Sequence, residues 1–118
     1  MGYANNMIAI KRAYETPAKS DGVRILVDRL WPRGVLKAKL KLDAWEKELA
    51  PSTKLRQWFG HDPKRWSEFK KRYKVELHAH RDQLRLLKHR AHKITLVYAA
   101  KDTEHNHAVV LREVLERI

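Results

Sequence analysis

The chain has 118 residues, a hydrophobic fraction of 43% and a charged fraction of 34%, which predict one soluble globular domain and exclude a disordered chain. It contains no cysteine, which excludes disulfide bonds, thiolate nucleophiles and cysteine metal sites and is compatible with the cytoplasm. Its formal net charge of +12 suits a polyanionic partner such as nucleic acid, and equally a solvated basic surface.

The chain is expected to divide into a flexible leader, residues 1–6, and a single domain, residues 7–118. The leader has no basic segment followed by an apolar run, so it does not resemble a signal peptide. No apolar run approaches the roughly 20 residues of a membrane span. We therefore expect a cytoplasmic protein with no membrane partner.

The first half of the chain is expected to hold two strands. Met7 to Ala13 combines apolar and basic residues in a strand pattern, and residues 16–22 have the composition of a turn. Val23 to Leu30 is the second predicted strand. Residues 34–41 form a basic loop or a short helical turn, whereas Leu42 to Leu49 fits either a strand or a helix.

Helices are expected to dominate the next part of the chain. Ser52 can cap a helix that Gly60 ends, and Asp62-Pro63 is typical of the start of another. Apolar residues then recur at spacings of three and four for about 30 residues, which indicates an amphipathic helix face. Because this is long for a small domain, we expect a break at residues 80–82, with Asp82 capping the second segment.

A strand and a helix complete the predicted fold. Ile94 to Ala100 is apolar throughout, which is typical of a central strand covered on both faces. The last helix is expected from about Glu104, with an i,i+4 ion pair between Glu113 and Arg117. Its predicted buried stripe is Ala108, Leu111, Leu115 and Ile118. This alternation predicts an α/β fold: a single compact layered domain with a mostly parallel central sheet flanked by helices.

The segment from Asp28 to Gly34, with the sequence DRLWPRG, is the strongest functional signal. It follows the apolar run 25–27 and ends in residues that turn the chain. Ligands of open α/β sheets bind outside the carboxyl ends of strands. Guanidinium groups placed there, on Arg29 and Arg33, suit a phosphate or carboxylate, which they can grip with two hydrogen bonds.

The end of the last predicted strand offers a second set of candidates. Lys101 and Asp102 close that strand, and His105 and Asn106 are expected in the first turn of the last helix, where free N–H groups favour anions. If the two strands are neighbours, both sets meet at one edge of the sheet. Asp102 could instead only cap the helix, and Asp28 could only pair with an arginine.

One aromatic residue and one further histidine complete the candidate site. Trp31 lies in the polar loop and is the expected stacking partner for a planar part of the ligand, whereas Trp58 and Trp66 are expected in the core. His61 could supply an acid or base in the neutral pH range, or could be a surface residue. The predicted catalytic residues are His105, Asp102 and His61. The predicted ligand-binding residues are Asp28, Arg29, Trp31, Arg33, Lys101 and Asn106.

Several other chemistries lack their sequence signals. Six of the seven histidines occur in pairs two residues apart or among lysines and arginines, so neither a metal nor another cofactor is expected. The four glycines form no phosphate-binding loop or dinucleotide fingerprint, and there is no G-x-S-x-G motif. Covalent catalysis has weak support.

These motifs resemble those of the YeaO-like family, a group of bacterial domains of unknown function. The resemblance spans nearly the whole chain from Met7 and implies a compact α/β fold but no particular activity. It rests on the segments Asp21-Gly22-Val23-Arg24, residues 27–34, Leu49-Ala50-Pro51-Ser52, residues 55–63, Ala100-Lys101-Asp102 and His105-Asn106.

The interpretation favoured by the sequence is one pocket that binds a small anionic ligand, phosphorylated or nucleotide-like. Acid–base catalysis on that ligand is the reaction the residues could support. The alternative is a nucleic-acid-binding accessory protein that uses the helices between residues 61 and 93, a segment with 11 Lys and Arg against four Asp and Glu. The sequence determines neither the ligand nor the oligomeric state.

Overall fold

A computed structural model describes residues 6–118. Residues 1–5 of the predicted leader lie outside this range, whereas the Asn6 amide donates a hydrogen bond to the Lys88 carbonyl. Within residues 6–118, none of the helices has the length and apolar character needed to cross a bilayer.

Four parallel strands form the central sheet, in the order β1-β4-β2-β3. They are β1 (Met7–Arg12), β2 (Val23–Leu26), β3 (Ala44–Trp45) and β4 (Lys93–Tyr98). The predicted α/β class with a parallel sheet is confirmed, and β4 is a central strand that is buried from Ile94 to Tyr98.

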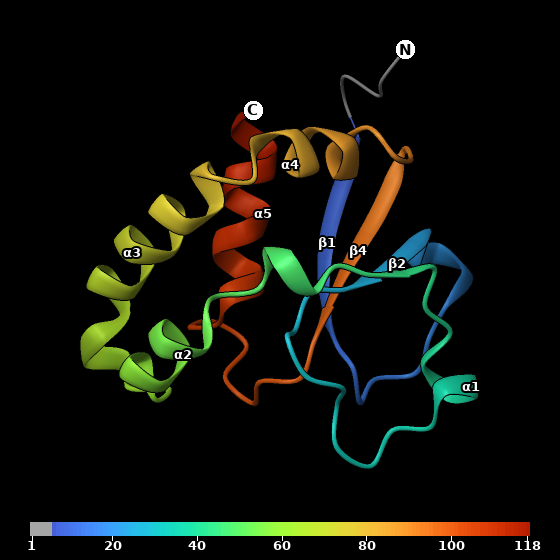
Figure 1. Cartoon of the computed structure of the whole chain (residues 1–118). Helices are drawn as coiled ribbons and strands as arrows, with labels where there is room; N and C mark the ends of the chain where they lie inside the picture. Colours follow the sequence, from blue (N-terminus) through green and yellow to red (C-terminus); the bar gives the residue numbers. More distant parts are fainter. Residues whose placement is uncertain (1–5) are drawn as a thin grey trace.

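Helices cover the two faces of the sheet unequally. Figure 1 shows α2 (Thr53–Phe59), α3 (Trp66–His78), α4 (Arg81–Lys88) and α5 (His107–Arg117) on one side, with α5 beside β1 and β4. The larger hydrophobic core lies between this helical layer and the sheet. A smaller cluster around Leu26, Leu40 and Val97 involves the short helix α1 (Lys37–Leu40). Single 3-10 turns occupy residues 19–21, 47–49 and 63–65.

At most helix ends, the capping residue expected from the sequence is the one that sets the boundary. Ser52 accepts a hydrogen bond from the Leu55 N–H (3.1 Å), and Gly60 ends α2 in the left-handed conformation, with φ of 53°. Asp62 caps the 3-10 turn that leads into α3. The long amphipathic segment breaks at residues 79–80, close to the predicted position.

Two predicted strand and helix boundaries are wrong in detail. β2 ends at Leu26 rather than Leu30, because the Asp28 side chain accepts the Ala99 N–H (3.0 Å) and the chain turns away from the sheet. Asp82 is not a cap: it lies inside the first turn of α4, whose N-cap residue, His80, makes no capping hydrogen bond. The ambiguous segment Leu42 to Leu49 contains both the two-residue strand β3 and a 3-10 turn.

The last helix also departs from the prediction. α5 begins at His107, not Glu104, because Asn106 is its cap and accepts the Val109 N–H at 3.1 Å. Glu113 pairs with lysines of α3 rather than with Arg117. The predicted stripe is buried except for Ile118, which lies after the helix end and is 49% exposed.

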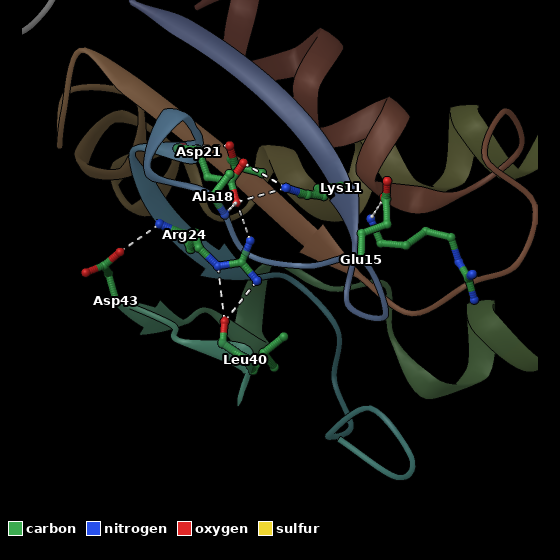
Figure 2. Close-up of polar contacts among 9 residues, drawn as sticks. Lys11, Glu15, Ala18, Asp21, Arg24, Leu40 and Asp43 are labelled. Carbon is green, nitrogen blue, oxygen red and sulfur yellow. Dashed lines mark hydrogen bonds and ion pairs between the residues drawn. The ribbon is translucent and has the colours of Figure 1, made fainter. Parts of the chain in front are cut away.

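A buried ionic network stabilises the sheet face opposite the helical layer (Figure 2). Asp21 pairs with Arg24 (2.7 Å) and with Lys11 (3.1 Å), and the Arg24 guanidinium donates two further hydrogen bonds to the Leu40 carbonyl. Asp21 and Arg24 are 7% and 3% exposed. The network ties the turn between β1 and β2 to both strands and to α1.

Candidate functional site

A cavity of about 590 Å³ lies at the carboxyl ends of the strands. The chain enters β1 from the top of Figure 1, so the carboxyl ends of these parallel strands point to the bottom, where the connecting loops gather. Because β2 pairs directly with β4, the loop after β2 and the loop after β4 lie side by side. Both loops, the turn after β1, α2 and the segment just before α2 contribute to the cavity wall.

Eight of the nine predicted site residues line this one cavity. They are Asp28, Arg29, Trp31, Arg33, His61, Lys101, Asp102 and Asn106. His105 is not part of the lining: its ring packs edge-on against Trp66, with the ring centres 5.3 Å apart. The cavity therefore brings together the candidate anion-binding groups but not the first of the candidate catalytic residues.

Asp28 connects three neighbouring elements. One carboxylate oxygen accepts the Ala99 N–H, and the other lies 2.8 Å from His107 Nε2. His107 Nε2 also lies 3.1 Å from the Val27 carbonyl, which is the partner aligned for a hydrogen bond. Since both neighbours of Nε2 are acceptors, we assign a proton to Nε2. The Asp28 backbone carbonyl accepts the indole N–H of Trp45 at 2.7 Å.

The side chain of Arg29 is largely occupied by the backbone. Its Nε and one terminal nitrogen donate to the Pro51 and Ala50 carbonyls, both at 3.2 Å. This arginine also lines a second, smaller cavity of about 320 Å³ beside Ser52 and Glu76. Arg29 thus forms a wall between two cavities and fixes the segment before α2 against the loop after β2.

Arg33 and Lys101 are the freer cations of the predicted set. Both are exposed, and within residues 6–118 neither side chain makes an ion pair or hydrogen bond. Arg56 of α2 lines the same cavity and is equally exposed and unpaired over the described range. Three cationic side chains therefore surround the cavity without a carboxylate partner.

Asp102, His105 and Asn106 organise the loop between β4 and α5. The Asp102 carboxylate accepts the N–H groups of Glu104 and His105, both at 2.9 Å, and contacts His105 Nδ1 at 3.0 Å. The N–H of His105, followed by that of Glu104, lowers the pKa of Asp102 below 3.8. The Asn106 amide donates to the Asp102 carbonyl at 2.9 Å. These contacts explain why α5 starts three residues later than expected.

Trp31 and His61 both line the cavity and have different neighbours. The Trp31 indole donates to the Val35 carbonyl (2.7 Å) and packs edge-on against Trp45, with ring centres 5.5 Å apart. His61 is exposed, has a positive φ of 56°, and lies with its ring centre 6.1 Å from that of Phe59.

Sequence reasoning missed three polar or charged residues of the lining: Tyr14, Arg56 and His107. Tyr14 lies two residues after the end of β1, so the expectation that strand ends meet at one edge could have identified it. Arg56 lies four residues before the C-cap of α2, and no local pattern distinguishes it from a solvated helix cation. His107 is the first residue of α5, which was expected to start earlier.

Metal binding has no geometric support in the part of the chain that is described. Among residues 6–118, no three histidine, aspartate or glutamate side chains cluster closely enough to hold an ion. The side chains of the cavity offer hydrogen-bond donors and positive charge.

Comparison with known proteins places the chain in a family. Residues 7–118 match a family model described as the inactive DUF488-N3 subclade. The uncharacterized protein YeaO of Escherichia coli (strain K12) is 45% identical over 113 residues, which cover 94% of this chain and 98% of that protein.

Mycobacterial relatives extend the comparison. The uncharacterized proteins Mb3100c of Mycobacterium bovis and Rv3073c of Mycobacterium tuberculosis are each 41% identical over 110 residues, covering 92% of both chains. No solved structure matches the chain. The resemblance expected from the sequence motifs is thus confirmed, and the chain belongs to the YeaO-like family, in the subclade described as inactive DUF488-N3.

Proposed function

We propose that this chain binds a small anionic ligand, phosphorylated or nucleotide-like, in the cavity at the carboxyl ends of its strands. The observation that carries the proposal is the set of three unpaired cations, Arg33, Arg56 and Lys101, around a single cavity. Asp28 and Asp102 also line the cavity, but their carboxylates are engaged by His107 and by backbone N–H groups. The cations without a carboxylate partner therefore leave an excess of positive charge, which attracts anionic ligands. Arginines at its mouth suit a phosphate, because each can donate two parallel hydrogen bonds to it.

The size and the apolar wall of the cavity support a ligand larger than a bare phosphate. Small-molecule sites in proteins span about 300 to 1,000 Å³ and combine a mostly apolar lining with a few placed polar groups. The cavity of about 590 Å³ is bounded by Pro32, Pro51, Phe59 and Phe69 on its apolar side. An anionic group joined to an apolar or planar body matches this division.

Binding without turnover is the form of the proposal we favour. His105 lies outside the cavity lining, and the Asp102 carboxylate is engaged by its own loop. Acid–base chemistry on a bound ligand would fall to His61 or to His107 with Asp28. The description of the matching subclade as inactive argues for a binding protein over an enzyme.

Nucleic acid binding by the helices between residues 61 and 93 is the competing function. Many cations of that segment already have acidic partners, which reduces the charge available to a polyanion. The ion pairs are Lys70–Glu113, Lys74–Glu113, Arg72–Glu68, Arg65–Asp62 and Arg85–Asp82. Lys88 is buried and donates to the Ile118 carbonyl. The free charge around the cavity favours the small ligand.

Thermal unfolding in the presence of inorganic phosphate tests the proposal. A ligand that binds only the folded state raises the Tm by mass action. We expect phosphate to raise the Tm of the unchanged protein, and Arg33→Ala and Lys101→Ala each to remove most of that rise.

Lys71→Ala is the matched control. Lys71 is exposed on α3 and unpaired within residues 6–118, so its removal changes the net charge equally without touching the cavity. The Tm rise should persist in this variant. Equal losses in all three variants, or no rise in the unchanged protein, would reject the proposed site.

A further inference from the structure

Tyr14 is the most exposed aromatic side chain of the cavity. It lies two residues after the end of β1 and is 49% exposed. The other aromatic rings of the lining are packed into the protein: Phe59 and Phe69 are 5% and 1% exposed and stack on each other with ring centres 4.2 Å apart. The half-buried Trp31 belongs to the smaller core cluster. Tyr14 is thus the one of these four rings that is not packed against a hydrophobic core cluster.

The Tyr14 ring is nevertheless held in place. Its hydroxyl donates to the Arg33 carbonyl at 3.0 Å, and the Arg12 guanidinium lies over the ring, 5.0 Å from its centre. Arg12 is itself anchored to the end of β4 by hydrogen bonds to the carbonyls of Ala100 (2.9 Å) and Ala99 (3.3 Å). The ring is therefore held between the end of β4, through Arg12, and the loop after β2, through the Arg33 carbonyl.

One face of this ring remains available. Arg12 covers one face, and within residues 6–118 no other ring or cation packs on Tyr14. A fixed aromatic ring loses little conformational entropy when a planar group stacks on it, and such stacking accepts any heterocyclic base because each base has a π-face. The hydroxyl bond to the Arg33 backbone places the ring next to one of the unpaired cations of the cavity.

We propose that Tyr14 is the residue that recognises the ligand's planar part: its free face stacks on a heterocycle whose attached phosphate is held by Arg33 and Lys101. This inference rests on the proposed function and narrows it to phosphorylated heterocycles of the nucleotide type. The Arg12 guanidinium, stacked on the far face, stabilises the ring orientation. Tyr14 acts in specificity and not in holding the phosphate.

Two probes that each carry one phosphate distinguish anion binding in the cavity from stacking on Tyr14. Adenosine 5′-monophosphate carries a planar base, and ribose 5-phosphate does not. We expect the unchanged protein to bind the nucleotide about tenfold more tightly than the sugar phosphate in calorimetric titrations, an effect in the range of one stacked base. Tyr14→Ala should abolish that preference by weakening only the nucleotide about tenfold.

Tyr14→Phe is the matched variant, because it keeps the ring and removes the hydroxyl that holds Arg33. It should bind both probes within about twofold of the unchanged protein. If Tyr14 only positions Arg33, Phe and Ala variants will weaken both probes alike, which overturns the inference but leaves the anion site standing. Equal affinity of the unchanged protein for the two probes also overturns it. Absence of binding by either probe rejects the proposed function and this inference with it.

Discussion

Removing the Asp21 carboxylate should be among the most damaging single changes outside the cavity. Asp21 accepts hydrogen bonds from the Arg24 guanidinium, from Lys11 Nζ and from the Ala18 N–H (2.9 Å), and it is 7% exposed (Figure 2). Asp21→Ala leaves the Arg24 cation, which is 3% exposed, without its ion-pair partner. Such a buried charge without a partner strongly lowers the free energy of unfolding.

The size of the loss follows from what Arg24 retains. Breaking a buried ion pair costs about 3 to 5 kcal/mol of the free energy of unfolding. The two hydrogen bonds from Arg24 to the Leu40 carbonyl survive, at 2.9 and 3.1 Å, and keep the guanidinium partly satisfied. We therefore expect the lower end, about 3 kcal/mol, which is a large part of the roughly 5 to 15 kcal/mol of an ordinary domain.

Urea unfolding followed by circular dichroism measures this loss, provided that the m-value is unchanged. Glu68→Ala is the control, because it removes a carboxylate from the exposed i,i+4 pair with Arg72 and should cost about 0.5 kcal/mol or less. A cost for Asp21→Ala as small as that of the control would show that the buried network does not hold the β1–β2 turn.

The same network predicts how stability depends on pH. Burial alone would raise the pKa of Asp21, but the Ala18 N–H, Lys11 and Arg24 outweigh it, so the folded-state pKa lies below 3.8. The unfolded chain then binds the proton more readily, and the contribution of Asp21 is present above about pH 3.8 and is lost as the pH falls through the folded-state pKa. Asp21→Ala should flatten this acid limb of the stability curve; an unchanged limb would contradict the assignment.

Three further changes probe the fold and the proposed site, and a fourth, Lys71→Glu, serves as a control. Gly22→Ala should destabilise the fold strongly, because its φ is +65° and a Cβ would lie 2.4 Å from the Lys93 carbonyl oxygen; a Tm unchanged from the parent would contradict this. Asn106→Ala removes the α5 cap and should cost about 1 kcal/mol or somewhat more in urea unfolding, since the side chain is buried. Arg29→Ala should weaken phosphate binding whereas Lys71→Glu should not, and the reverse pattern in titrations would favour nucleic acid binding by the helices.

The fold was largely predictable because its signals are local. Ser52 begins α2 by capping it with its side chain, and Gly60 ends α2 by adopting a left-handed backbone conformation. Both effects depend on residue type alone. The central position of β4 followed from its uninterrupted apolar run. The two-residue strand β3 was not predictable, because it exists only through its pairing with β2 and has no pattern of its own.

For the site, the sequence predicted which loops meet but not which partners each side chain contacts. Parallel pairing of β2 with β4 brings the two cationic loops together, and this could be anticipated from the sequence. The partners of each side chain could not: Arg29 meets carbonyls more than 20 residues away, at Ala50 and Pro51. His105 was misplaced because Asp102 takes the N–H groups of the loop and delays the start of α5.

A nuclear magnetic resonance titration with adenosine 5′-monophosphate tests the central claim most directly, because it reports where on the chain the ligand binds. We expect the largest changes in backbone amide shifts in the loop after β2, residues 28–34, and in the loop after β4, residues 99–107, both of which border the cavity. They should vanish in the Arg33→Ala variant. Changes centred on the helices between residues 61 and 93, or no changes at saturating nucleotide, would contradict the account.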